Sequence, residues 1–332
     1  MMIRILSSSI AFTMITGCGA GTNFRNALPD EDVVQVPFPA RGESAGGLVG
    51  TTASGLVGGP ADFYTHTYYA SRAVNGFALH VVRAVQRVAA LPATSVSLDT
   101  AVWGPFSADG EPIEYRLTIR DLGAHQDWHA ELRHKSASDF VLMAGGSFEP
   151  VSEELGRGWF AVDFDAIRSV NLAEPNRGRI SYAFERTAEA LNVRAYASRE
   201  LAGTTEEAGY AYGKSAEGAG FVMFAVPENI AATSDFGFED TGAKERLLIH
   251  SRWSASGSGR ADALVAEGDL GSSAAIAAQC WNDRFASTFE AVGVDGTIRA
   301  SSGDPSSCVA DPEVPEATDL PDEDGVANPH VE

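Results

Sequence analysis

Two carboxylates two residues apart, Asp163 and Asp165, could do acid–base chemistry together. On an extended strand they would share one face at a separation of about 7 Å, with Trp159 on that same face. Such a pair beside an aromatic ring could serve a glycoside hydrolase or bind a cation. The apolar residues at 160, 162 and 164 would then lie on the other face. The carboxylates therefore also fit the solvated side of an amphipathic strand, which is the interpretation we prefer.

Histidine spacing raises a second possibility, metal binding. His125 and His129 are four residues apart, as two ligands on one face of a helix would be. Residues 127–133, however, alternate between polar and apolar side chains, which indicates a strand preceded by a turn at His125. Two imidazoles placed in this way do not converge. We therefore expect solvent-exposed histidines and no metal site.

A glycine-rich segment at residues 209–215, GYAYGKS, is similar to a phosphate-binding loop. The loop pattern has one more residue between its glycines and leads into a helix, whereas this segment lies among predicted strands. We interpret it as a strand that places Tyr210 and Tyr212 on one face, and we expect no nucleotide and no other cofactor. The sequence also has no His-Glu-x-x-His and no Ser-x-x-Lys motif, which lowers the expectation of an enzyme.

Cys280 and Cys308 are the two cysteines of the presumed folded region, and an even pair in an oxidising compartment predicts a disulfide. Closing the intervening loop would stabilise the fold by roughly 3 to 4 kcal/mol on a loop-entropy estimate. Zinc is the alternative, but two thiols without a nearby third ligand rarely hold it.

The third cysteine, Cys18, ends the run Ile-Thr-Gly-Cys at residues 15–18, after a short apolar stretch that follows Arg4. The layout is typical of an export signal, and the apolar stretch is too short to span a bilayer. The four residues resemble the lipobox of bacterial lipoproteins. The resemblance implies removal of residues 1–17, lipidation of Cys18 and stable anchoring by several acyl chains. It further implies the cell envelope, and Gly19 is compatible with the outer membrane, on its periplasmic or its external side.

The net charge of the chain argues against some classes of binding partner. The chain has 45 acidic against 24 basic residues and a net charge of −21, which argues against nucleic acid and against an anionic membrane surface. At 44% hydrophobic residues it has ample material for a core, and its 34 glycines suit a turn-rich β protein.

The periodic elements begin after a segment at 18–58 that is rich in Gly, Ser and Pro, which we predict to be a flexible tether. Apolar residues then recur at three and four positions over residues 61–90, which predicts a long amphipathic helix. From residue 113 the period changes to two, as in half-buried antiparallel strands, and about ten such strands follow, including one at 280–289. Residues 309–332, with many acidic residues and no Lys or Arg, predict a disordered acidic tail. Residues 322–325 there are similar to part of a calcium loop, but the other ligand positions do not match.

We therefore predict one domain at residues 59–308 of the α+β class, mostly β. The helix would pack on a curved antiparallel meander sheet or open barrel. In layout alone this is similar to the half-barrel carriers that move lipids and lipoproteins across the bacterial envelope, and likeness of fold carries function poorly.

The resulting functional hypothesis is a non-enzymatic, lipid-anchored binding or interaction module. A lipid or other apolar ligand would lie between sheet and helix, against Phe77, Val81, Trp128, Trp159, Phe221 and Trp253. If these side chains are plain core, the partner would be another envelope protein. The alternative is an extracytoplasmic hydrolase of cell-wall or sugar polymers that uses Asp163 and Asp165.

Overall fold

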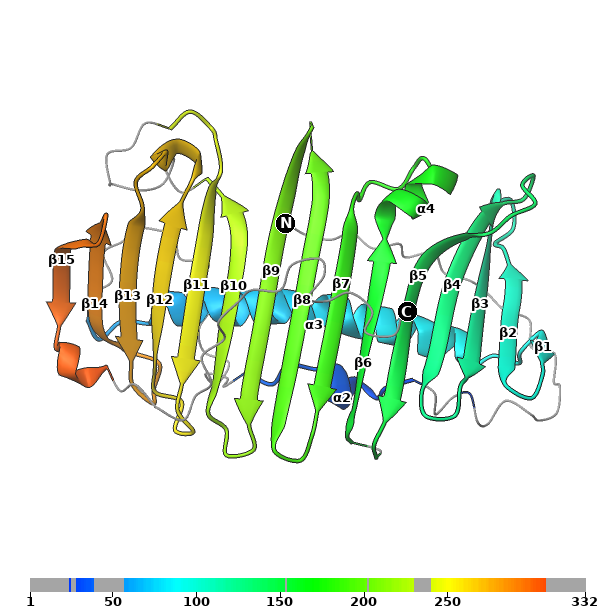
Figure 1. Cartoon of the computed structure of the whole chain (residues 1–332), viewed down its shortest axis with the longest axis horizontal. Coiled ribbons are helices and arrows are strands. Elements are labelled where there is room, and N and C mark those ends of the chain that lie inside the picture. Colours follow the sequence, from blue (N-terminus) through cyan, green and yellow to red (C-terminus); the bar gives the residue numbers. More distant parts are fainter. Residues whose placement is uncertain are drawn as a thin grey trace.

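The computed structural model describes residues 24, 28–38, 57–152, 154–201, 203–229 and 240–308. Cys18 with the predicted signal, most of the predicted tether, and the predicted acidic tail at 309–332 lie outside the described residues. Within them the chain forms one open antiparallel sheet of 15 strands with few helices (Figure 1). The predicted class, α+β and mostly β with an antiparallel sheet, is confirmed.

The strands follow one another across the sheet in chain order, and each pairs with its sequence neighbours. Short connections allow this, because antiparallel neighbours need only a turn between them. The strands are β1 (Ser95–Val96), β2 (Thr100–Phe106), β3 (Ile113–Asp121), β4 (Gln126–His134), β5 (Val141–Pro150), β6 (Gly156–Asp163), β7 (Arg179–Arg186), β8 (Ala190–Leu201), β9 (Thr204–Ser215), β10 (Gly220–Glu228), β11 (Glu245–Trp253), β12 (Gly259–Ala266), β13 (Ala275–Trp281), β14 (Ser287–Val294) and β15 (Thr297–Gly303). The helices are α2 (Glu31–Val34), α3 (Asp62–Ala89) and α4 (Phe164–Val170), with 3-10 turns η2 (Gly268–Leu270) and η3 (Pro305–Ser307).

One predicted strand, at residues 280–289, is wrong. The structure divides it into β13 and β14, with a turn between Trp281 and Ser287. The Oδ1 atom of Asn282 accepts hydrogen bonds from the backbone N–H groups of Arg284 and Ala286, which closes the turn. An Asn side chain that bonds the backbone two residues on is a common turn former, so this boundary had a local signal in the sequence.

Helix α3 lies across the strands on one face of the sheet (Figure 1). Near its beginning the backbone N–H of Phe63 donates to Gln279 Oε1 on β13 (2.9 Å). Just after its end Trp103 Nε1 on β2 donates to the carbonyl of Leu91 (2.8 Å). We call the face that α3 covers the inner face and the opposite one the outer face. No helix among the described residues is long and apolar enough to cross a bilayer.

Residues 28–38, which we call the strap, are packed on the domain, so the prediction of a flexible tether is wrong for this stretch. Val34 and Val36 are buried. Asn75 of α3 pairs with both backbone groups of Val36, at 2.8 and 2.9 Å, and the hydroxyl of Tyr182 on β7 donates to the carbonyl of Val34. Apolar residues within a segment otherwise rich in Gly and Pro account for the packing, because they bury area beside α3.

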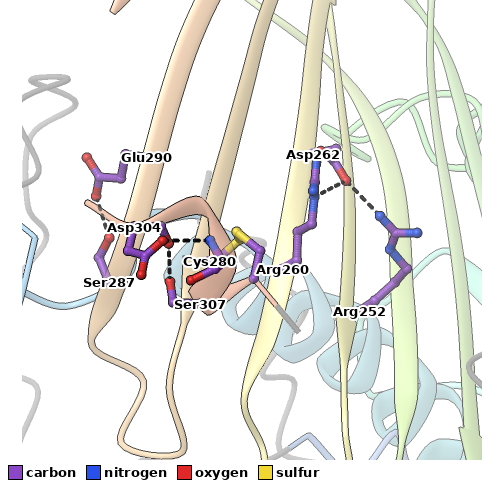
Figure 2. Close-up of a disulfide and its surroundings, with 10 residues drawn as sticks. Arg252, Arg260, Asp262, Cys280, Ser287, Glu290, Asp304 and Ser307 are labelled. Atoms are coloured by element: carbon purple, nitrogen blue, oxygen red, sulfur yellow. Dashed lines mark hydrogen bonds and ion pairs between the residues drawn. A yellow bond between two sulfur atoms is a disulfide. The ribbon is translucent and has the colours of Figure 1, made fainter. Parts of the chain in front are cut away.

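The predicted disulfide is confirmed. Cys280 on β13 and Cys308 are joined, 28 positions apart, with their Cα atoms 5.3 Å from each other. Figure 2 shows the bond beside η3, where the Oδ1 atom of Asp304 accepts from the N–H of Ser306 (2.8 Å). The bond therefore holds the chain that follows the edge strand β15 against β13, two strands further in.

Removing the disulfide should destabilise the domain without changing its fold. We expect the double variant Cys280→Ala/Cys308→Ala to lose roughly 3 kcal/mol of unfolding free energy, because the unfolded chain regains the entropy of an open loop. Differential scanning calorimetry would show a melting temperature several degrees lower. Dithiothreitol should lower the melting temperature of the parent protein similarly and leave the variant unchanged; equal melting temperatures of parent and variant would contradict the expectation.

Candidate functional site

The space between α3 and the inner face is filled by side chains. Phe77 and Val81 of α3 are buried there, and the Phe77 ring lies 5.9 Å from that of Phe160 on β6. Trp128 on β4 is also buried. A cavity beside it, lined by residues of the strap, α3 and β4–β7, has a volume of about 10 Å³. That volume holds about one water molecule, far less than the several hundred Å³ of a ligand pocket.

The six residues proposed to line an apolar ligand site do not share one face. Trp253 lies on the inner face, 2% exposed, with its ring 5.0 Å from that of Phe38 in the strap. Trp159 alternates with the inward-facing Phe160, so its side chain lies on the outer face, although the residue borders the cavity beside Trp128. Phe221 alternates with its neighbour at 222 in the same way and also lies on the outer face. The strand period alone could not say which set of alternate residues faces the helix.

Two pairs of buried hydroxyl groups fix α3 on the sheet. The hydroxyl oxygens of Thr67 and Ser251 are 2.6 Å apart, and those of Ser71 and Tyr210 are 2.9 Å apart. Burial raises the pKa of Tyr210, so its hydroxyl stays protonated at physiological pH. Each of these four buried hydroxyl groups has a hydrogen-bond partner. The two pairs therefore form a structural network that determines where α3 lies along the strands.

A cluster of titratable groups lies where α3 begins. Burial and then the negative charge of Glu290 raise the pKa of Asp62, the first residue of α3. Glu290 Oε1 in turn accepts from Gln279 Nε2 and Ser287 Oγ, both at 2.8 Å. A carboxyl group with a raised pKa, such as that of Asp62, can act as a general acid. Its neighbour Glu290, however, accepts hydrogen bonds from within the fold and holds the strands together. We therefore assign this cluster to the junction of α3 with β13 and β14.

Asp163 and Asp165 are not a pair on one strand. Strand β6 ends at Asp163, whose Oδ1 accepts from the backbone N–H of Ala166 (2.7 Å) and so caps helix α4. Asp165 lies in the first turn of α4 and is exposed. The alternating pattern continued past the true end of the strand, because a capping carboxylate and a strand-face carboxylate look alike in the sequence. The geometry proposed for a hydrolase is absent at these two residues.

The histidine and glycine motifs also have structural roles. His129 lies within β4, and His125 Nε2 lies 3.7 Å from Asp127 Oδ1. Among the described residues no group of three His, Cys, Asp or Glu side chains is placed to hold a metal. The segment 209–215 is the end of β9, and its Tyr212 hydroxyl donates to the carbonyl of Pro37 in the strap (2.6 Å).

A serine pattern elsewhere adds nothing to these candidates. Residues 42–46, GESAG, match the Gly-x-Ser-x-Gly pattern of a nucleophile elbow. They lie outside the described residues, in a segment rich in Gly, Ala and Ser. That pattern needs a strand before it and a helix after it, and the surrounding sequence predicts neither.

The outer face carries paired charges over β3 and β4. Arg116 pairs with Glu131, and Arg133 with Glu114, each at 2.8 Å. Both guanidinium groups lie over the ring of Phe140, at 4.1 and 4.4 Å from its centroid. Stacking on an aromatic ring holds guanidinium groups in a fixed geometry. This part of the outer face is therefore an ordered polar surface.

The capping role of Asp163 predicts unequal effects of the two carboxylates. We expect Asp163→Ala to lower the unfolding free energy by about 1 kcal/mol, because it removes a side-chain cap from α4. Asp165→Ala is the matched control and should change it by less than about 0.5 kcal/mol. Urea unfolding of both variants measures the difference. Equal losses for the two would rule out the cap as the reason Asp163 matters.

No family model, curated protein or solved structure matches this chain. Its function has to be inferred from its own geometry.

Proposed function

We propose that this chain is a lipid-anchored protein of the cell envelope and acts there as a non-enzymatic interaction module. In this proposal the anchor is on Cys18, the membrane is the outer membrane, and the partner is another envelope protein that binds the outer face of the sheet. The lipobox at residues 15–18 supports the anchor. The filled space between α3 and the sheet is the observation that carries the choice of partner.

That filling favours an interaction surface over a carrier. A carrier for an apolar ligand would need a cavity of several hundred Å³ against the inner face, and the cavity beside Trp128 measures about 10 Å³. A hydrolase would need convergent carboxylates, and Asp163 instead caps a helix. The outer face offers what a protein partner needs, which is ordered charges at Arg116 and Arg133 and an exposed Arg194 on β8.

We propose further that the sheet curves around α3. The helix contacts β13 near its beginning and β2 just after its end. Twenty-eight helical residues span about 42 Å. The eleven strand spacings between β2 and β13 would span roughly 53 Å if the sheet were flat. A concave inner face reconciles the two lengths.

The anchor is tested by replacing the cysteine. We expect Cys18→Ala to move the protein from the membrane pellet to the soluble fraction of expressing bacteria, because it removes the site of acylation. The double variant Cys280→Ala/Cys308→Ala is the control for a cysteine change elsewhere and should stay in the pellet. Continued sedimentation of Cys18→Ala with membranes would overturn the lipid anchor.

The filled interior is tested on the soluble protein. We expect native mass spectrometry of Cys18→Ala, purified from the periplasm, to give the mass of the polypeptide alone, since the cavity that the described residues line beside Trp128 is only about 10 Å³. Solvent extraction followed by lipid analysis is the independent check. A lipid of defined mass that co-purifies in equal molar amount would overturn the interaction-surface proposal and restore the carrier.

A further inference from the structure

The strap shortens the distance between the domain and its anchor. Phe24 is 5% exposed and Leu28 is 7% exposed, and both belong to the main hydrophobic core. Residue 24 is only six positions after Cys18. Six fully extended residues reach about 20 Å at most. A protein anchored at Cys18 is thus held close to the lipid surface, and not at the end of a forty-residue tether.

The strap also fixes where the anchor leaves the domain. Leu28 lines the cavity beside Trp128, together with Val82 and Val85 of α3. Trp128 is the third residue of β4, so it lies near the rim at which β3 turns into β4. Gln86 of α3 donates to the carbonyl of Pro29 (3.0 Å), which holds the strap there. In Figure 1 the β3–β4 turn is at the lower edge of the sheet, in its right half.

Exposed apolar side chains lie on this same rim. In a meander every second connection is at the same rim, so the β1–β2, β3–β4 and β5–β6 turns share one. They carry Leu98 at 101% exposed, Leu122 at 51% and Val151 at 71%. The first two turns touch, because the N–H of Asp121 donates to the carbonyl of Asp99 (2.8 Å). We call Leu98, Leu122 and Val151 the contact rim.

We propose that the contact rim rests on the lipid surface and orients the anchored domain with its strands steeply inclined to the membrane. The proposal rests on the anchor at Cys18 proposed above. A domain whose residue 24 lies within about 20 Å of an acyl anchor presents its apolar loop tips to the bilayer at high effective concentration. Asp99, Asp121 and Glu154 lie in or beside these turns, against Arg120 and an Arg157 that is paired with Glu149, so the surface suits zwitterionic better than anionic lipid.

The test uses the acylated full-length protein in phosphatidylcholine vesicles. Single cysteines at the contact rim, Leu98→Cys and Leu122→Cys, take an environment-sensitive fluorophore, since Cys18 is acylated and the other two cysteines are bonded. Leu172→Cys is the matched control, because Leu172 is 79% exposed and follows β6, at the opposite rim. We expect emission at shorter wavelength, and quenching by nitroxide-labelled lipid, for the labels at 98 and 122 and not for that at 172.

A second variant separates the short linker from other causes. Thirty Gly and Ser residues inserted after residue 20 lengthen the linker while leaving Phe24 and the strap in place. We expect the labels at 98 and 122 to lose much of their quenching.

The outcomes are distinct. A purified protein whose mass shows an unmodified Cys18 would overturn the anchor and this proposal together. An acylated protein whose three labels are equally accessible to water would overturn the contact rim alone. Quenching at 98 and 122 that survives the insertion unchanged would support the contact rim and overturn the short linker as its cause.

Discussion

The burial of one apolar sheet face beneath one helix is the constraint on which the rest of the structure depends. Fifteen strands in a single layer leave a long apolar face that another element must cover. Helix α3 covers this face only because its stripe runs its whole length, from Tyr64 to Ala89. The strap covers what α3 leaves open beside it. Large aromatic side chains on alternate positions of the strands fill the remaining depth, as Trp128, Tyr182 and Trp253 do.

The hydrogen-bonded polar groups between α3 and the sheet determine the position of the helix. Apolar packing alone would allow the helix to shift along the strands. A helix lying across strands meets a repeating surface, and apolar contacts alone tolerate a shift along it. The bonds of Thr67 with Ser251 and of Ser71 with Tyr210 do not, because a shift would leave buried hydroxyls without partners. Asn75 extends the same row to the backbone of the strap. The helix, the sheet and the strap are thereby held in one arrangement.

Sequence periodicity predicted the sheet well because alternation is a physical consequence of strand geometry, and cysteine parity predicted the disulfide. Strand periodicity cannot predict which side of each strand faces the helix, and for this reason the sequence groups Trp159 and Phe221 with Trp128 although their side chains lie on the other face. The alternating pattern also predicts a strand face for Asp163, because a single capping residue has no periodicity that would mark it as a cap. The strap was missed because short apolar runs between Gly and Pro carry too few residues to show a period. For the strand faces and the strap the missing information was a contact between segments far apart in the chain, whereas the cap of Asp163 is a local contact three residues along the chain.

The packing of the strap bears more directly on the proposed function than any single candidate residue does. If Cys18 carries the lipid, the packing of Phe24 and Leu28 decides how far the domain stands from the membrane and which rim is nearest to it. With the strands steeply inclined to the membrane, the outer face, which carries Arg116 and Arg133, points sideways over the membrane surface and away from α3. A partner on the same membrane could then reach that face from the side. The packing that covers the inner face would thus also determine how the outer face is presented.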